Sequence, residues 1–238
     1  MKLMECHNWD KSSWLSSDDY FSKLVDQITT NVSIGATDQL LDIGCGRGYL
    51  LKKLIQKVDF KLKPIGIDSV DHQNEFAQEL IFVNDSILNY LKNSKLKFDI
   101  IFIKQMLHLL NSHERIFLYD QLKNRLSSKG ALIILYMSQE SSLPTFPLMH
   151  SYLQKSLLIH RDIENEIHQN FNHQKIKKFT YEVKIKKEEY LQMIKNKFIT
   201  VLLKMNARQV EEGMRFIDQH YDSELKFNDE LIIQIINQ

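Results

Sequence analysis

Residues 40–57 contain a strand pattern, a glycine-rich turn and a helix pattern in direct succession. Residues 40–43 read Leu-Leu-Asp-Ile, and from Tyr49 onward apolar residues recur at helical spacing. Three glycines stand between them at alternate positions: Gly44, Gly46 and Gly48. Glycine permits tight turns and the close approach of a ligand to the backbone. The segment therefore predicts an α/β fold with a ligand site where this strand ends.

The spacing of the glycines separates two kinds of cofactor site. A dinucleotide-binding fingerprint has glycine at its first, third and sixth positions, and the sixth position here is Tyr49. The pattern therefore disfavours NAD, although an NAD-binding oxidoreductase remains an alternative. Cys45 lies between two of the glycines, and we interpret it as a small residue in a crowded turn rather than as a reactive thiol.

The composition is that of an ordinary globular chain. The 238 residues are 43% hydrophobic, and 31 basic residues against 30 acidic ones leave a net charge of +1. This balance gives no reason to expect nucleic acid or an anionic membrane as a partner. The chain has no apolar run of the ~18 residues that a membrane span needs and no apolar signal core. Because its two cysteines make no disulfide framework, we expect a cytoplasmic protein.

Strand patterns alternate with helix patterns along the chain. Strands are expected at 39–43, 64–67, 80–83, 98–103, 131–136, 176–186 and 231–236. Helices are expected at 16–30, 49–57, 112–127, 148–172, 187–204 and 207–220. This alternation predicts an α/β protein with a Rossmann-like, doubly wound, mostly parallel sheet of seven strands, the last of them antiparallel.

We interpret residues 1–238 as one domain with helical additions. Residues 38–138 form the core, 139–172 and 187–223 are helical insertions over the active site, and 1–30 is an N-terminal helical lid. Packing of the insertions over the carboxyl edge of the sheet would enclose whatever binds there.

Large aromatic residues mark the proposed lid. Trp9, Trp14 and Tyr20 could close over the site and exclude water. The alternative is that Tyr20 fixes the first helix to the core. Ser16, followed by Asp19 three residues later, predicts a capping box at the start of this helix.

Acidic residues stand at the ends of two further strands. Asp68 comes 20 residues after Gly48, where a carboxylate can accept hydrogen bonds from both hydroxyls of a ribose. Asp85 ends the third strand, where it can reach an adenine amino group while the backbone of Ser86 meets the ring edge. An Asp is often a plain turn or cap residue, but two of them in phase with the glycine loop favour a ligand site.

Five short motifs follow one another in the core. They are residues 41–48 (Leu-Asp-Ile-Gly-Cys-Gly-Arg-Gly), 66–68 (Gly-Ile-Asp), 84–86 (Asn-Asp-Ser), 98–101 (Phe-Asp-Ile-Ile) and 126–132 (Leu-Ser-Ser-Lys-Gly-Ala-Leu). Together they resemble the motifs of class I S-adenosylmethionine-dependent methyltransferases. The resemblance implies S-adenosylmethionine as the cofactor. The cofactor-binding residues that it implies are Asp42, Gly44, Cys45, Gly46, Gly48, Asp68, Ser69, Asn84, Asp85, Ser86, Ile103 and Lys104.

The C-terminal part resembles a subgroup of this family that acts on small molecules. Its landmarks here are Glu189-Tyr190, Met193, Lys197-Phe198 and Phe227-x-Asp229. The chain departs from the family at two places. The stretch between Asp68 and the third strand is shorter than the helix usually found there, and Lys197 stands where the subgroup often has arginine.

Methyl transfer requires mainly alignment of the acceptor, the methyl carbon and the sulfur, with water excluded. A base is needed when the acceptor arrives protonated. Lys104 and His108 stand four residues apart and would share a face on a helix, so we name both as catalytic candidates. Tyr136 and Ser138 end the fifth strand and could hydrogen-bond the acceptor. The alternatives are a His108 held in packing and a Tyr136 that reaches out to water.

The other histidines of the helical insertion do not suggest a metal centre. His160, His168 and His173 lack the spacing and the acidic or cysteine partners of a tetrahedral site. We expect them at solvated positions and expect no metal.

The residues after the fourth strand bear on the acceptor. Residues 103–106 (Ile-Lys-Gln-Met) lack the Asn or Asp before Pro-Pro that nucleic-acid amino methyltransferases commonly have, and no cysteine nucleophile follows. We therefore expect a small-molecule acceptor with an O, N or S nucleophile, bound by a monomer or a homodimer. An RNA or protein methyltransferase stays open because residues 175–187 are rich in lysine, and so does a catalytically silent cofactor-binding module.

Overall fold

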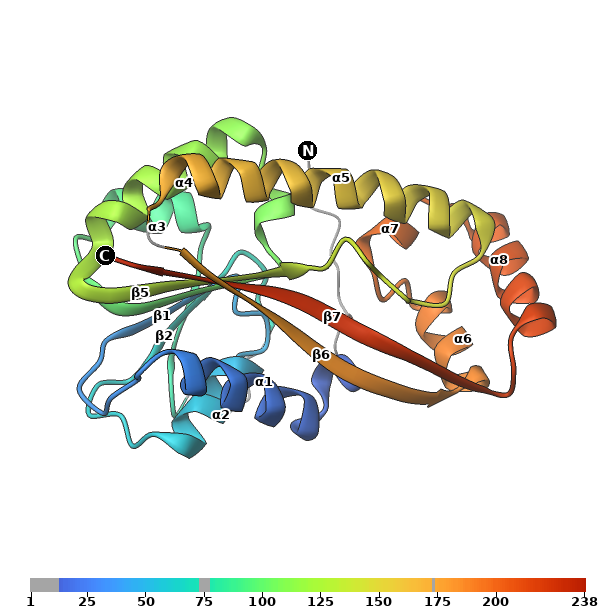
Figure 1. Ribbon diagram of the computed structural model, residues 1–238, viewed down its shortest axis with the longest axis horizontal. Coiled ribbons are helices and arrows are strands. Elements are labelled where there is room, and N and C mark those ends of the chain that lie inside the picture. Colours follow the sequence, from blue (N-terminus) through green and yellow to red (C-terminus); the bar gives the residue numbers. More distant parts are fainter. Residues whose placement is uncertain (1–12, 73–77, 173) are drawn as a thin grey trace.

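The computed structural model describes residues 13–72, 78–172 and 174–238, which form a seven-stranded sheet with helices on both faces (Figure 1). The strands are β1 (Leu40–Ile43), β2 (Ile65–Asp68), β3 (Ile81–Asn84), β4 (Phe98–Lys104), β5 (Leu126–Met137), β6 (Gln174–Lys186) and β7 (Glu224–Asn237). Their order is β3-β2-β1-β4-β5-β7-β6, and β7, the last in sequence, is antiparallel to both neighbours. The predicted seven-stranded doubly wound sheet with an antiparallel last strand is confirmed.

Two groups of helices sandwich the sheet. The helices are α1 (Asp18–Asn31), α2 (Tyr49–Lys57), α3 (Ile87–Asn93), α4 (Ser112–Arg125), α5 (Pro147–Asn170), α6 (Lys187–Lys195), α7 (Thr200–Leu203) and α8 (Ala207–His220). Short 3-10 turns are η1 (Trp14–Ser16) and η2 (Leu107–Leu109). The helices α1 and α2 cover one face, and α3, α4 and α5 cover the other (Figure 1).

The apolar patterns explain why the central elements form. All four residues of β1 are buried, as expected of a parallel strand that is covered on both faces. In α1 the buried residues recur at helical spacing: Tyr20, Phe21, Leu24, Val25 and Ile28. The predicted capping box of Ser16 and Asp19 is wrong, because α1 begins with a simple N-cap one residue later. Ser17 is the N-cap, with its Oγ accepting from the Tyr20 N–H at 3.1 Å, and Ser16 belongs to η1.

Other boundaries also differ from the expectation. The strand β5 begins at Leu126 rather than at 131, with an irregular register opposite Phe98–Ile100, so residues 127–130 form no separate turn. The short helix α3 was not expected. The helix predicted at 187–204 is two helices, α6 and α7, separated around Lys197, whose φ is +53°.

The hairpin of β6 and β7 extends past the rest of the sheet and carries α6, α7 and α8 at its far end (Figure 1). The helix α5 contacts both parts, since its first half meets α7 and α8 and its second half meets α4 and the sheet. The division of the chain into lid, core and insertions stays a prediction, and Trp9 of the proposed lid lies outside the described residues.

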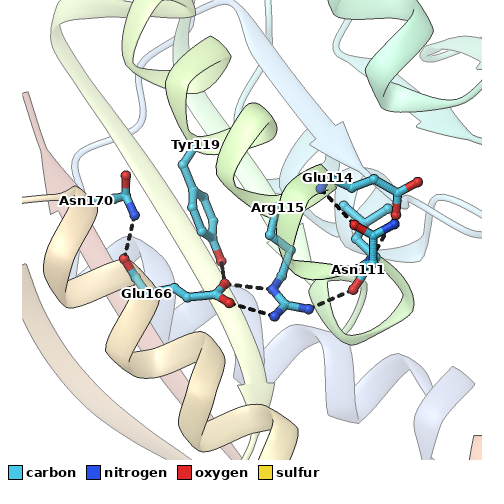
Figure 2. Close-up of polar contacts among 7 residues, drawn as sticks. Asn111, Glu114, Arg115, Tyr119, Glu166 and Asn170 are labelled. Carbon is cyan, nitrogen blue, oxygen red and sulfur yellow. Dashed lines mark hydrogen bonds and ion pairs between the residues drawn. The ribbon is translucent and has the colours of Figure 1, made fainter.

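A buried ion pair fixes α5 to α4 (Figure 2). The Arg115 guanidinium donates to both carboxylate oxygens of Glu166, at 2.7 and 2.6 Å, and its third nitrogen donates to the Leu110 carbonyl at 2.7 Å. Tyr119 also donates to Glu166. Because Leu110 directly follows η2, this pair connects α4, α5 and the loop after β4.

Candidate functional site

The glycine loop connects β1 to α2 at the carboxyl edge of the sheet. All three glycines have positive φ, at +71° for Gly44, +54° for Gly46 and +80° for Gly48. The loop is fixed to β2, because the N–H groups of Gly44 and Cys45 both donate to the Ile67 carbonyl. A Cβ on Gly44 would lie 2.8 Å from the Met106 side chain, whereas a Cβ on Gly46 would meet no atom within 4 Å. Gly46 is thus the point where the backbone faces open space.

Asp42 is a buried carboxylate directly before this loop. It is 1% exposed, and its Oδ1 has no hydrogen-bond partner among the described residues. Burial raises its pKa from 3.8 to about 7, with Asp68 acting in the same direction and Lys104 against it. An unsatisfied buried carboxylate costs free energy, and such groups are most often explained by function.

Asp68 links the end of β2 to the glycine loop. Its Oδ2 accepts from the Gly46 N–H and its Oδ1 from the Val70 N–H, both at 2.9 Å. Burial works against ionisation, but His72 and these two N–H groups outweigh it and hold the pKa of Asp68 below its ordinary value. Asp68 is therefore ionised at neutral pH.

The end of β3 lies beside Asp68. The Asn84 side chain and the Asp85 N–H both donate to the Asp68 carbonyl, at 3.1 Å each. Asp85 accepts from the Ser86 N–H, and Ser86 is the N-cap of α3. The structure thus brings together the predicted residues of the first three strand ends, and the exposed Ser69 stands next to them.

Cys45 packs beneath the loop. Its Sγ would lie 2.8 Å from a Cβ placed on Gly66, so the thiol fills the space that this glycine leaves. Burial, with Asp42 and Asp68, raises the pKa of the Cys45 thiol, which stays protonated at neutral pH. This geometry agrees with a small packing residue rather than a reactive one.

Lys104 and His108 do not share a helical face, so that expectation is wrong. Lys104 ends β4, beside the buried Ile103, and its Nζ lies 5.4 Å from the Phe21 ring centroid on the α1 side. His108 belongs to η2 and faces α5 on the opposite side, with its ring centroid 5.3 Å from that of His160. Gln105 lies between them with a φ of +51°, and the chain turns there, so that Lys104 and His108 point to opposite sides of the sheet.

His108 lies against the buried His160, so the expectation of a solvated His160 is also wrong. His160 is 5% exposed and His108 is half-buried, and neither Nδ1 atom has a hydrogen-bond partner among the described residues. Burial lowers the pKa of each imidazole to about 4, and His160 adds to the effect on His108. The sequence spacing could have predicted that His160 is buried, because this residue falls three positions from both Leu157 and Ile163 on the apolar stripe of α5.

Tyr136 and Ser138 both lie within the structure rather than at an open strand end. Tyr136 is 3% exposed, and its hydroxyl donates to Gln234, which pairs with Ile134 two residues back along β5. This hydroxyl therefore leans away from the carboxyl edge, and it does not reach out to water. The Ser138 hydroxyl accepts from the Glu140 N–H in a local turn.

A cluster that the sequence argument did not assign lies on the α1 side of the edge. The Trp14 indole donates to Asp229 of β7 at 3.0 Å, and its ring packs edge-on against Phe198 and Phe227. Tyr20 is fully buried nearby, and its hydroxyl makes no hydrogen bond of good geometry within the described part of the chain. Phe227-x-Asp229 was noted as a landmark, but nothing in the sequence indicates a contact across 215 positions.

The described residues hold neither a metal-binding cluster nor a membrane-spanning helix. No three His, Cys, Asp or Glu side chains gather there in a way that could hold a metal ion. No described helix is long and apolar enough to cross a membrane. His173 lies outside this part of the chain.

Comparisons with known proteins agree on one family. A family model described as a methyltransferase domain matches residues 34–198. An uncharacterized methyltransferase of Schizosaccharomyces pombe, C70.08c, is 25% identical over 105 residues, which cover 42% of this chain and 39% of that protein. The chain therefore spans well under half the length of this curated relative.

Solved structures share the fold at low identity. The YcgJ protein of Bacillus subtilis has 13% identity and a TM-score of 0.58, over 91% of this chain and 97% of its own. A SAM-dependent methyltransferase of Archaeoglobus fulgidus has 17% identity and a TM-score of 0.53, over 91% and 94%. The plantazolicin methyltransferase BamL, solved in complex with a triazolic desmethylPZN analog and SAH, has 14% identity and a TM-score of 0.52, over 92% and 85%. Because the family model matches more than half of the chain, this chain belongs to the methyltransferase domain family, within the class I methyltransferases that use S-adenosylmethionine.

Proposed function

We propose that this protein transfers the methyl group of S-adenosylmethionine to a small-molecule acceptor by in-line displacement. The main support for cofactor binding is the buried Asp42 carboxylate beside the glycine loop. One of its oxygens has no hydrogen-bond partner among the described residues. A carboxylate there fits the ammonium group of the methionine half. The open space at Gly46 and the ionised Asp68 fit the rest of the cofactor, with Asp68 toward the ribose hydroxyls.

The cofactor supplies an already activated methyl group. The protein therefore has to orient the cofactor and the acceptor and to exclude water, rather than to activate the methyl group. Asp42 and the loop backbone hold the methionine half, while Asp68 and the end of β3 hold the adenosine half, through residues 84–86. The backbone at Ile103 and Lys104 completes the cradle at the end of β4. Orientation of this kind supplies several orders of magnitude in rate.

Of the predicted catalytic residues, His108 could accept a proton only weakly. Its imidazole is neutral at pH 7 because burial lowers its pKa to about 4, and the same low pKa makes it a poor base. It belongs to η2, just beyond the end of β4, and faces α5. Lys104 fits a positioning role, and the Tyr136 hydroxyl leans away from the edge.

The position of the lysine-rich strand favours a small acceptor over RNA. The strand β6 is the far edge of the sheet, separated by β7 and β5 from the strands that hold the cofactor. Its Lys178 already pairs with Glu230 and Glu140. One neighbouring structure, the plantazolicin methyltransferase BamL, was solved in complex with a triazolic desmethylPZN analog and SAH. A cytoplasmic location and a single domain with a lid belong to the same proposal.

Calorimetry with S-adenosylmethionine, S-adenosylhomocysteine and NAD tests the cofactor. We expect binding of the first two, and Asp68→Ala should weaken it by about 1–3 kcal/mol, the scale of a lost charged hydrogen bond. The exposed Asp59→Ala serves as the matched control. Unchanged affinity in Asp68→Ala would remove this residue from the site.

Labelled cofactor then tests the acceptor. The protein is incubated with methyl-labelled S-adenosylmethionine and with separate metabolite, RNA and protein fractions of a cell extract. We expect label in the metabolite fraction. Label in RNA alone contradicts the small-molecule proposal, and tight cofactor binding without transfer to any fraction supports a silent module instead.

A further inference from the structure

We propose that Asp229 and Tyr20 form the acceptor-recognition subsite, and that they select small molecules carrying a protonated amine. This inference rests on the proposed function, because it names the class of acceptor for that site. It uses a cluster on the α1 side of the carboxyl edge that has no part in holding the cofactor.

The topology places Asp229 where an acceptor would arrive. In β7 the pairing with β5 ends at Met137–Leu231, and the Ser138 N–H donates to the Glu230 carbonyl. Asp229 is thus the next residue beyond the carboxyl end of β5. The charge of Lys104, at the end of β4, lowers the pKa of both Asp229 and Asp42. Lys104 is therefore near both carboxylates, and the cluster adjoins the methionine end of the cofactor cradle.

The polar groups of the cluster are incompletely satisfied. Among the described residues the Asp229 carboxylate receives one hydrogen bond, from Trp14, although a carboxylate offers about four acceptor positions. The fully buried Tyr20 hydroxyl is close enough to Asp229 for each group to shift the pKa of the other, but among the described residues it makes no hydrogen bond of good geometry. Burial raises the pKa of Asp229 even though Trp14, Lys104 and Tyr20 oppose it. A ligand that donates hydrogen bonds would satisfy both groups.

The charges around the cluster favour a cation. Of the charged groups that shift the pKa values of Asp42 and Asp229, Lys104 is positive and Asp68 is negative, whereas Glu230 is already paired with Lys178 at 2.8 Å. The Lys104 ammonium lies 5.9 Å from the Tyr20 ring centroid, and one ammonium group cannot neutralise Asp42, Asp68 and Asp229 together. The remaining negative charge suits an ammonium group and opposes a carboxylate.

The Trp14 ring, whose indole donates to the Asp229 carboxylate, belongs to a group of packed and buried aromatic rings. Trp14 lies 5.2 Å from Phe227 and 5.9 Å from Phe198 between ring centroids, and Tyr190 contacts both of these phenylalanines. Aromatic faces attract ammonium groups and pack against apolar ligand bodies. The cluster thus combines one carboxylate with an aromatic wall, which is the chemistry that recognises amines.

Binding of matched probes to the full chain saturated with S-adenosylhomocysteine tests the inference. The probes are 2-phenylethylamine and butylamine, each compared with the alcohol and the carboxylate of the same skeleton. We expect the amines to bind about tenfold more tightly than their alcohols, as for one charged hydrogen bond, and the carboxylates not to bind. Equal binding of amine and alcohol, or no binding of either amine, contradicts the inference.

Variants separate recognition from a structural role of Asp229 in anchoring Trp14. Asp229→Asn should remove the preference for amines, and Tyr20→Phe should weaken amine binding while keeping the ring packing. Glu230→Gln, the neighbouring acid paired with Lys178, is the matched control and should keep the preference. If Asp229→Asn lowers the melting temperature but keeps the preference, Asp229 only anchors Trp14. Failure of S-adenosylhomocysteine to bind would instead overturn the proposed function.

Discussion

At the scale of single residues, Asp42 shows how a binding site costs stability. The folded protein raises the pKa of this carboxyl from 3.8 to about 7, so between these values the native state holds a proton that the unfolded chain has lost. The destabilisation from Asp42 is therefore absent below about pH 4, grows as the pH rises and is complete above about pH 7. We expect Asp42→Asn to be more stable than the natural chain by a margin that grows over this range, up to about 4 kcal/mol.

Chemical unfolding between pH 4 and 8 measures that margin. Asp59→Asn, an exposed acid with no such burial, is the control and should show no growing margin. The same Asp42→Asn variant should lose affinity for S-adenosylhomocysteine, because an amide carries no charge for the ammonium group. A margin that does not change with pH would show that Asp42 is not protonated in the folded protein.

At the scale of elements, two glycines of the same loop have different roles, because Gly44 is required for packing and Gly46 for cofactor binding. Gly44→Ala places a methyl group 2.8 Å from Met106 at a φ of +71°, so it should destabilise the fold. Gly46→Ala has free space and should cost about 1–2 kcal/mol for the left-handed backbone alone. We expect Gly46→Ala to lose at least about tenfold in cofactor affinity, since its methyl group enters the space assigned to the cofactor.

Thermal unfolding and calorimetry on both variants make the comparison. Gly35→Ala is the control, because its Cβ would meet only ordinary contacts, at 3.8 Å from Asp38. Full cofactor affinity in Gly46→Ala would place the cofactor elsewhere.

The contact between α4 and α5 rests on the ion pair shown in Figure 2. Arg115 is 6% exposed and the Glu166 side chain 19%, so removing one partner leaves a poorly solvated charge. We expect Arg115→Met and Glu166→Gln each to lower the free energy of unfolding by on the order of 2 kcal/mol. The double variant should lose less than the sum of the two, as measured in a double-mutant cycle.

The pair Lys123 and Asp120, with side chains 39% and 61% exposed, provides the control cycle and should show little coupling. Additive effects in the Arg115–Glu166 cycle would mean that the two side chains do not stabilise one another.

The elements also show what the sequence could and could not predict. Strands buried on both faces, such as β1 and β4, are mostly apolar and were located within one or two residues. The helix α3 was missed because it buries only Ile87 and Leu91, too few residues to show a helical period. The break at Lys197 was missed because a positive φ at a lysine leaves no glycine or proline signal.

At the scale of the whole molecule, the sequence predicts the cofactor-binding residues but not the contacts on the acceptor side, and this difference has a physical cause. The cofactor residues are local to strand ends, so motif and topology together predict that they meet. The contacts of Trp14 with Asp229 and of His108 with His160 join segments far apart in sequence. They depend on where η1, α5 and β7 pack, and no local pattern determines that.

The position of the cofactor at one side of the sheet leads to a prediction for hydrogen exchange. S-adenosylhomocysteine should slow exchange at the ends of β1, β2, β3 and β4, where we place it, because ligand binding suppresses local opening. The strand β6 lies at the other edge of the sheet and should be unaffected. Addition of a short single-stranded RNA should slow exchange at neither place. A contrary result would be that RNA slows exchange in β6 and also at the strand ends that S-adenosylhomocysteine protects. The lysine-rich strand would then belong to a substrate path, and an RNA methyltransferase would be favoured over a small-molecule enzyme.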